Sequence, residues 1–295
     1  MSAALSLAQI VAVLERRYPL GSAEPWDAVG LVCGDPAAPV RRILWAIDPV
    51  EAVVDQAIDQ QVDLVITHHP LLLTGVHSVA ATDAKGRIVH RLISSGIALY
   101  CAHTNADIAD PGVSDARARA LGVMDTRPLD SSVSARQDRT AVPSGLAQQE
   151  GTAVPVGLGR IGHLPAPMPL GAFAETVVSA LPATRHGARV LGDPDVVVRT
   201  VAVCGGSGDA LLTVATASGA DVYVTADLKH HRALEHRDEG GCAVIDVAHW
   251  ASEWPWLAQA AELLDRDLAA QGDTVDSLVS DIPTDPWTFS LRSAP

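Results

Sequence analysis

The feature that most constrains the fold is an internal repeat with an offset of 158 residues. Residues 40–67 align without a gap with residues 198–225, so that Val, Arg, Ala, Ala, Asp and Thr coincide and apolar positions track each other. Each copy then reaches a further strand-like run that ends in a histidine, with an acid four residues later. We therefore expect two similar lobes, 1–125 and 161–295, joined by a linker or surface excursion at 126–160.

Strand-like and helix-like segments alternate within both lobes. Helical periodicity appears at 6–17, at 50–60 and at 115–121, where Ser114 is the expected N-cap. The alternation predicts an α/β fold made of two similar α/β lobes with mainly parallel sheets. The strand-like runs are Ile43–Ile47, Leu64–Ile66, Ala98–Ala102, Val197–Val203, Val222–Val224 and Ala243–Val247.

Composition limits the class of protein. The 295 residues carry a formal net charge of −14, so the chain lacks the excess of basic residues that is typical of a nucleic-acid-binding protein. This argues against nucleic acid as a main partner. No apolar run reaches the roughly 18 residues that span a bilayer, and the N-terminus carries acid and base too early for a secretory signal. We expect a soluble cytoplasmic protein without a membrane partner. The 4 cysteines form no CxxC pair, so neither a disulfide framework nor a zinc–thiolate site is indicated.

Two adjacent histidines follow a predicted strand. His68 and His69 come directly after Leu64–Ile66, and ligands bind at the carboxyl ends of strands in α/β sheets. Consecutive side chains diverge, and each neutral imidazole offers one donor nitrogen, so this pair can serve two metal ions. The alternative is a surface pair without a ligand.

The H-x-x-x-acid pairs supply carboxylates as well. Asp107, four residues after His103, can bridge two cations through its two oxygens, which no histidine can do. His103 itself is a ligand, an outer-shell partner or a packed strand-end residue, and we favour the last two. If a helix begins near His249, then His249 and Glu253 lie on one face and can grip one cation.

A second histidine pair competes for the same role. Asp227 lies three and four residues before His230 and His231, so these side chains can also meet on a helix. Periodicity alone leaves open which histidine pair holds a metal, and this segment can instead line the pocket.

Two glycine-rich stretches need separate interpretations. Residues 157–162 match GxGxxG, but Pro165 and Pro167 prevent the helix that a dinucleotide site requires, so we reject such a site. Residues 204–209 lie between a predicted strand and a predicted helix. Their backbone amides form either an anion cradle or a tight turn that allows close packing.

Nearly the whole chain resembles the Nif-three-like family, the dinuclear metal-centre hexameric proteins known as GTP cyclohydrolase 1 type 2 homologues. The combination of THHP with HWASE is the most specific part of the match. The matching segments are residues 24–31, 67–72 (THHPLL), 103–107 (HTNAD), 201–208 (VAVCGGSG), 225–231 (TADLKHH), 248–253 (AHWASE) and 284–287.

The resemblance implies a two-lobed α/β fold, a two-metal site drawn from both lobes, and a toroidal homohexamer. It leaves His230 and His231 near the cavity but outside the ligand set. Longer family members carry an extra domain between the lobes, for which 126–160 is too short. The ligands that the resemblance implies agree with the spacing argument: His68, His69, Asp107, His249 and Glu253.

The sequence therefore favours a metal-dependent hydrolase acting on a small nucleotide-like or phosphoester substrate. Mixed histidine and carboxylate ligation allows two divalent ions of Zn, Mn, Fe, Co or Ni. The expected proton carriers or outer-shell residues are His103, Asp227 and His231. The alternative is a non-catalytic metal-handling or ring-shaped scaffold protein, which would have a closed site where a catalyst keeps a coordination position open.

Overall fold

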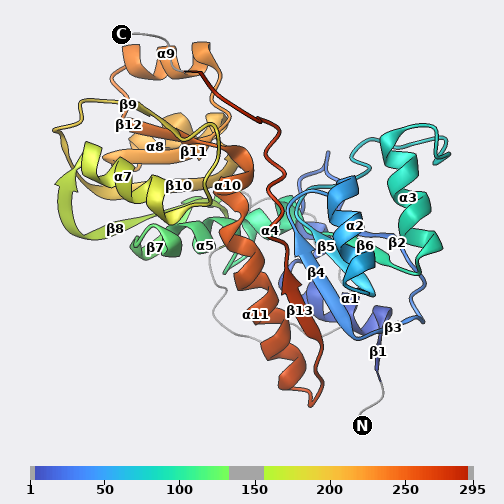
Figure 1. Cartoon of the computed structure of the whole chain (residues 1–295). Coiled ribbons are helices and arrows are strands. Elements are labelled where there is room, and N and C mark those ends of the chain that lie inside the picture. Colours follow the sequence, from blue (N-terminus) through green and yellow to red (C-terminus); the bar gives the residue numbers. More distant parts are fainter. Residues whose placement is uncertain (1–3, 133–155, 292–295) are drawn as a thin grey trace. The chain divides into compact units, whose positions relative to one another are not determined.

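The protein is represented by a computed structural model that describes residues 4–132 and 156–291 (Figure 1). The contacts between residues group the chain into two compact units. Among the described residues, no helix combines the length and the apolar character needed to cross a bilayer.

The chain passes between the units more than once. The first unit is Met1–Ala106 with Leu257–Thr284, and the second is Asp107–Trp256 with Asp285–Pro295. The division expected from the repeat assigned everything after residue 160 to the second lobe. Leu257–Thr284 belongs with the first unit because its strand pairs in parallel with a strand of that unit's sheet, from Asp276 opposite Arg42 to Val279 opposite Trp45.

The sheet of the first unit is almost entirely parallel, with the strand order β13-β4-β5-β6-β2. Only β2 runs antiparallel to its neighbour, β6. A separate two-stranded sheet pairs β1 with β3. The strands are β1 (Leu5–Ser6), β2 (Gly30–Cys33), β3 (Pro39–Val40), β4 (Arg42–Ala46), β5 (Leu64–Thr67), β6 (Ala98–Cys101) and β13 (Asp276–Val279).

Helices α2 and α3 share one buried core with this sheet (Figure 1). Val54 of α2 and Leu92 of α3 pack in one cluster with Leu44, Val65 and Leu99 of the three central strands. These strands are apolar because both of their faces are covered. The helices of this part of the chain are α1 (Leu7–Arg17), η1 (Leu20–Ser22), α2 (Glu51–Asp59), α3 (Ala84–Ser94), α4 (Thr104–Ile108) and α11 (Pro255–Ala269).

The sheet of the second unit is mixed, with the order β7-β8-β10-β11-β12-β9. The central strands β10, β11 and β12 are parallel, whereas β7, β8 and β9 pair antiparallel with their neighbours. The expectation of mainly parallel sheets is corrected here. The strands are β7 (Met124–Asp130), β8 (Leu158–Pro169), β9 (Ala188–Leu191), β10 (Val197–Ser207), β11 (Val222–Ala226) and β12 (Ala243–Val247).

The expected linker 126–160 begins and ends in strand. Its first residues belong to β7 and its last to β8, and these two strands pair with each other. Residues 133–155 of this segment lie outside the described residues. The helices of the second unit are α5 (Val113–Ala120), α7 (Leu170–Ala180), η2 (Asp209–Leu211), α8 (Leu212–Ala217), α9 (His230–Asp238) and α10 (His249–Glu253).

The internal repeat is present in strand register. Ile43 pairs with Leu64 in the first sheet, and Val201 pairs with Val222 in the second, which are the residues that the 158-residue offset makes equivalent. The offset therefore describes equivalent strand pairs as well as similar residues.

One carboxylate pins each of these strand pairs. Asp63 accepts hydrogen bonds from the backbone N–H groups of Arg41 (2.7 Å) and Arg42 (3.0 Å). Its repeat equivalent, Asp221, accepts from Arg199 (2.9 Å) and Thr200 (2.7 Å). Each aspartate precedes the second strand of a pair and binds the first strand just before the residues that pair, which fixes the register of both strands at one end.

Helix boundaries agree with the periodicity except at one cap. Helices α1 and α2 match the predicted 6–17 and 50–60 to within one residue at each end. The predicted N-cap Ser114 is wrong, because α5 starts at Val113 with Gly112 as its N-cap. Ser114 is buried, and its hydroxyl accepts a hydrogen bond from the backbone N–H of Gly205 (3.3 Å) instead.

We expect Asp63→Ala and Asp221→Ala to lower the free energy of unfolding by similar amounts, on the order of 1–2 kcal/mol each, because both remove a carboxylate that accepts two backbone hydrogen bonds. Urea denaturation measures the change. Asp59→Ala, at an exposed position in α2, is the control and should change the stability by less than about 0.5 kcal/mol. A negligible effect at both test positions would contradict the proposed pinning.

Candidate metal centre

Three histidines meet at one edge of the first sheet. His68 and His69 follow β5, His103 follows β6, and these strands are parallel neighbours whose carboxyl ends lie together. Each histidine offers one ring nitrogen, and these atoms all lie within 4.8 Å of one another. The His103 ring centroid is 5.1 Å from that of His68 and 5.6 Å from that of His69. The strand ends therefore bring together a cluster of nitrogen ligands.

The Nδ1 atom of each ring is already engaged. Nδ1 of His68 donates to the carbonyl oxygen of Ala102 (2.9 Å), because a carbonyl can only accept. Nδ1 of His69 lies 2.7 Å from Asp48 Oδ1, and Nδ1 of His103 lies 2.9 Å from Asp27 Oδ1. In a neutral imidazole held in this way, Nε2 carries the lone pair that a metal ion requires.

Asp27 is a firmly held orienting group. Its side chain is buried, and it also accepts hydrogen bonds from the backbone N–H (3.0 Å) and the hydroxyl (2.5 Å) of Thr104. Burial opposes ionisation of the carboxyl, but the hydrogen bonds from His103 and Thr104 lower the pKa of Asp27 well below its usual range. Asp27 is therefore a carboxylate that fixes the direction of the His103 ring.

The second unit holds a histidine between two carboxylates. His249 and Glu253 lie one turn apart on α10, and His249 Nε2 is 3.0 Å from Glu253 Oε1. His249 Nδ1 is 2.6 Å from Oδ2 of Asp227, which follows β11. Burial disfavours a charged ring, but Glu253 and Asp227 together raise the pKa of His249 to about 11. Without a metal ion, His249 is thus an imidazolium.

The glycine-rich stretch after β10 packs directly against this pair. Gly206 has φ +62°, and a Cβ placed on it would collide with Glu253 Oε1 and lie 3.1 Å from His249 Nε2. Its backbone N–H donates to the Ser252 hydroxyl (2.8 Å) in the middle of α10. Close packing, which was one of the two interpretations of residues 204–209, is therefore what these contacts support.

A buried cation lies behind the same strand ends. Arg117 of α5 is fully buried and donates to the carbonyl oxygens of Cys204 and Thr225, which lie within the last few residues of β10 and β11. Burial lowers the pKa of Arg117 to about 10, which leaves the guanidinium charged at neutral pH. Its positive charge partly offsets the negative charge of Glu253, which is itself 3% exposed.

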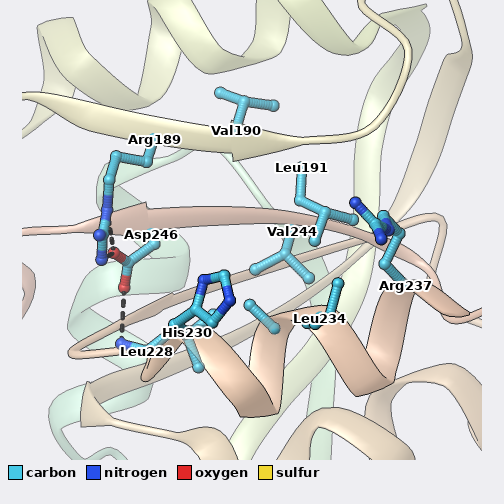
Figure 2. Close-up of a pocket in the computed structure, with 10 residues that line it drawn as sticks. Arg189, Val190, Leu191, Leu228, His230, Leu234, Arg237, Val244 and Asp246 are labelled. Atoms are coloured by element: carbon cyan, nitrogen blue, oxygen red, sulfur yellow. Dashed lines mark hydrogen bonds and ion pairs between the residues drawn. The ribbon is translucent and has the colours of Figure 1, made fainter.

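A cavity of about 300 Å³ lies under α9, beside β9 and β12 (Figure 2). None of the predicted metal ligands lines it. At one end, Asp246 accepts from Arg189 Nε (2.9 Å) and from the backbone N–H of Leu228 (3.1 Å), as Figure 2 shows. Leu228 directly follows Asp227, which has φ +57°, so this bond helps to hold the turn that points Asp227 at His249.

The other predicted residues fall in different environments. Asp107 is half-buried in α4, one turn after His103. Burial of the Cys204 thiol raises the pKa of that group, and the negative charge of Asp107 raises it further. His103 joins the nitrogen cluster, which makes it a stronger ligand candidate than its spacing indicated. The rings of His230 and His231 on α9 meet edge to face, with an interplanar angle of 72°, and neither residue belongs to a metal-type cluster among the described residues.

Sequence reasoning gave no role to Asp27 or Asp48. Asp48 lies just beyond β4, the parallel neighbour of β5, so the rule that drew attention to His68 applies to it as well. It also accepts a hydrogen bond from the hydroxyl of Thr284. Asp27 precedes β2, an edge strand that periodicity did not predict, so its only signal was its place in the 24–31 motif.

Comparisons with known proteins show which family the chain is similar to. Residues 5–286 match the profile of the family described as Duf34/NIF3 (NGG1p interacting factor 3). A Streptomyces coelicolor relative named GTP cyclohydrolase 1 type 2 homolog is 45% identical over 289 residues, which cover 98% of this chain and 96% of that protein. A Mycobacterium tuberculosis relative of the same name is 38% identical, covering 96% of this chain and 97% of that protein.

Solved structures show the same fold. The crystal structure of a Bacillus cereus protein related to NIF3 has a TM-score of 0.85 at 28% identity and covers 98% of this chain and 100% of that one. A hypothetical Staphylococcus aureus protein has a TM-score of 0.84 at 29% identity, with coverage of 97% and 100%.

We expect Gly206→Ala to lower metal content by at least half and to destabilise the protein by about 1–3 kcal/mol, because the new methyl group displaces Glu253 from His249. Elemental analysis and urea denaturation measure the two effects. Gly219→Ala is the matched control, since Gly219 also has a positive φ but a Cβ placed on it would meet nothing within 4 Å. If both variants lose the same stability and neither loses metal, the collision with Glu253 is unimportant.

Metal uptake should release protons and tighten as the pH rises. The raised pKa of His249, about 11, means that a metal ion has to displace a proton from this ring at any pH below that value. Titration calorimetry in buffers of different ionisation enthalpy should show about one proton released at this residue per protein. In metal-free protein the same shift stabilises the folded state fully below pH 6.5, and this contribution is lost as the pH rises towards 11. Metal affinity that stays constant from pH 6 to 9 would argue against His249 as a ligand.

Proposed function

Because the chain belongs to the Duf34/NIF3 (NGG1p interacting factor 3) family, we propose that it is a dinuclear metal-binding protein and acts as a metal-dependent hydrolase. The observation that carries this proposal is the orientation of its histidines. His69, His103 and His249 each direct Nδ1 at a carboxylate, and this carboxylate–histidine arrangement is typical of metal ligands. The proposed ligands are His68, His69, Asp107, His249 and Glu253.

The donor set fits divalent transition metals. Imidazole nitrogens and carboxylate oxygens together suit Zn, Mn, Fe, Co or Ni. When bound, two such ions activate water and offset negative charge that develops on a carbonyl, ring carbon or phosphoryl group. The relatives' name, GTP cyclohydrolase 1 type 2 homolog, supports a nucleotide-like or phosphoester substrate for this chain.

The remaining residues of the site hold and move protons. Asp227 fixes His249 through Nδ1, so its proposed role is to position that ligand. His103, oriented by Asp27, is proposed either to carry a proton at Nε2 or to act as an additional nitrogen ligand. His231 is proposed as a further proton carrier. We further propose that the protein assembles as a homohexamer, which mass photometry can test.

The decisive experiment combines metal analysis with hydrolase screening. Purified protein, His68→Ala and His249→Ala are reconstituted with each candidate metal and assayed against nucleotides and simple phosphoesters. We expect two metal equivalents in wild type, at most one in each variant, and turnover by wild type at least 100-fold above either variant. His90→Ala, at an exposed position of α3, is the control and should match wild type in both measurements.

Two negative outcomes have different meanings. If reconstituted wild type binds no metal, the whole proposal fails. If it binds two equivalents but hydrolyses no substrate faster than the two variants do, the hydrolase part fails. The protein is then a metal-handling or scaffold protein.

A further inference from the structure

We infer that Trp26 is a binding platform for a planar heteroaromatic ring, so that the substrate class is a nucleoside-type molecule rather than a simple aliphatic phosphoester. This inference rests on the proposed function and specifies the substrate of the same site. No role was assigned to Trp26 from the sequence, although this residue lies in the 24–31 motif. Trp26 is not among the proposed metal ligands.

Trp26 lies beside the nitrogen cluster of the first unit. Its ring centroid is 5.9 Å from that of His103, with an interplanar angle of 79°. The residue is nevertheless 59% exposed, so contact with the histidine leaves most of the indole accessible. A ring stacked on this indole would lie next to His103, whose ligand nitrogen is within 4.8 Å of those of His68 and His69.

The backbone on both sides of Trp26 is held in place. Glu24 donates its N–H to the Thr104 hydroxyl (2.9 Å), and Asp27 accepts from the Thr104 N–H (3.0 Å). Asp27 also donates its own N–H to the Glu24 carbonyl (2.9 Å), which closes a tight turn around Trp26. The buried Asp27 carboxylate thus anchors both the His103 ring and the loop that presents the indole.

This arrangement is preorganised for stacking. An exposed tryptophan on a mobile segment would lose conformational freedom on binding, whereas a fixed loop has already lost it. Stacking of a base on an aromatic side chain strengthens binding and tolerates different bases, because every base has a π face. The platform therefore selects for a flat ring system and leaves the choice among bases to other contacts.

The test compares two phosphate-bearing probes that differ in the base. Metal-loaded protein is titrated calorimetrically with guanosine 5′-monophosphate and with ribose 5-phosphate. We expect wild type to bind the nucleotide about 5- to 150-fold more tightly than the sugar phosphate, which is the range expected for one stacked base.

Three variants separate stacking from bulk and from folding. Trp26→Phe should keep most of the preference, because a flat ring remains. Trp26→Leu should bind the two probes within about 2-fold of each other, with metal content unchanged. Trp287→Ala removes an indole that is 66% exposed in the second unit, and this control should keep the full preference.

Each other result overturns the inference in a recognisable way. The indole does not bind the ring if wild type binds the two probes equally, or if Trp26→Leu keeps the preference for the nucleotide. Neither result affects the proposed metal site. Loss of metal in Trp26→Phe assigns the residue a structural role. If wild type binds neither probe, the nucleotide and phosphoester part of the proposed function fails with the inference, and the metal content measured on the same sample shows whether the metal site fails too.

Discussion

The hydrogen bond at Nδ1 is the interaction on which the chemistry of both units depends. A free imidazole rotates and exchanges tautomers, but His68, His69, His103 and His249 each have this nitrogen engaged by a carbonyl or a carboxylate. Every acceptor lies at or near the end of a strand, so the sheets position the acceptors and the acceptors position the rings. The rigid backbone thereby fixes the positions of the Nε2 atoms, which are the proposed ligand atoms.

The two units share a scaffold and differ in its use. Asp63 and Asp221 pin equivalent strand pairs with equivalent hydrogen bonds. Six residues later in each copy, however, the first unit has His69 and the second has Asp227. His69 is a ring held by a carboxylate, whereas Asp227 is a carboxylate that holds a ring. The repeat therefore preserves backbone geometry while the donor and the acceptor exchange places.

Sequence reasoning succeeded where short-range rules decide the structure. The central parallel strands, α1, α2, the helix at His249 and the strand-end position of His68 follow from periodicity and from the chemistry of strand ends. It missed β8, because the prolines and glycines of 157–169 obscure a strand that pairs antiparallel on both sides. It also missed Asp27, whose role depends on a contact with His103 across 76 residues. Such contacts leave no local pattern.

The return of Leu257–Thr284 to the first unit makes the order of synthesis matter. Strand β13 and the partners of Arg17 and Arg42, which are Asp267 and Asp276, leave the ribosome only after the whole of Asp107–Trp256. Until β13 has been synthesised, the first sheet ends at β4, and the outer edge of β4 has no partner strand. Such an exposed strand edge can pair with other chains. During translation the first unit is therefore interrupted by the synthesis of Asp107–Trp256, the largest segment of the second unit, and is completed only afterwards.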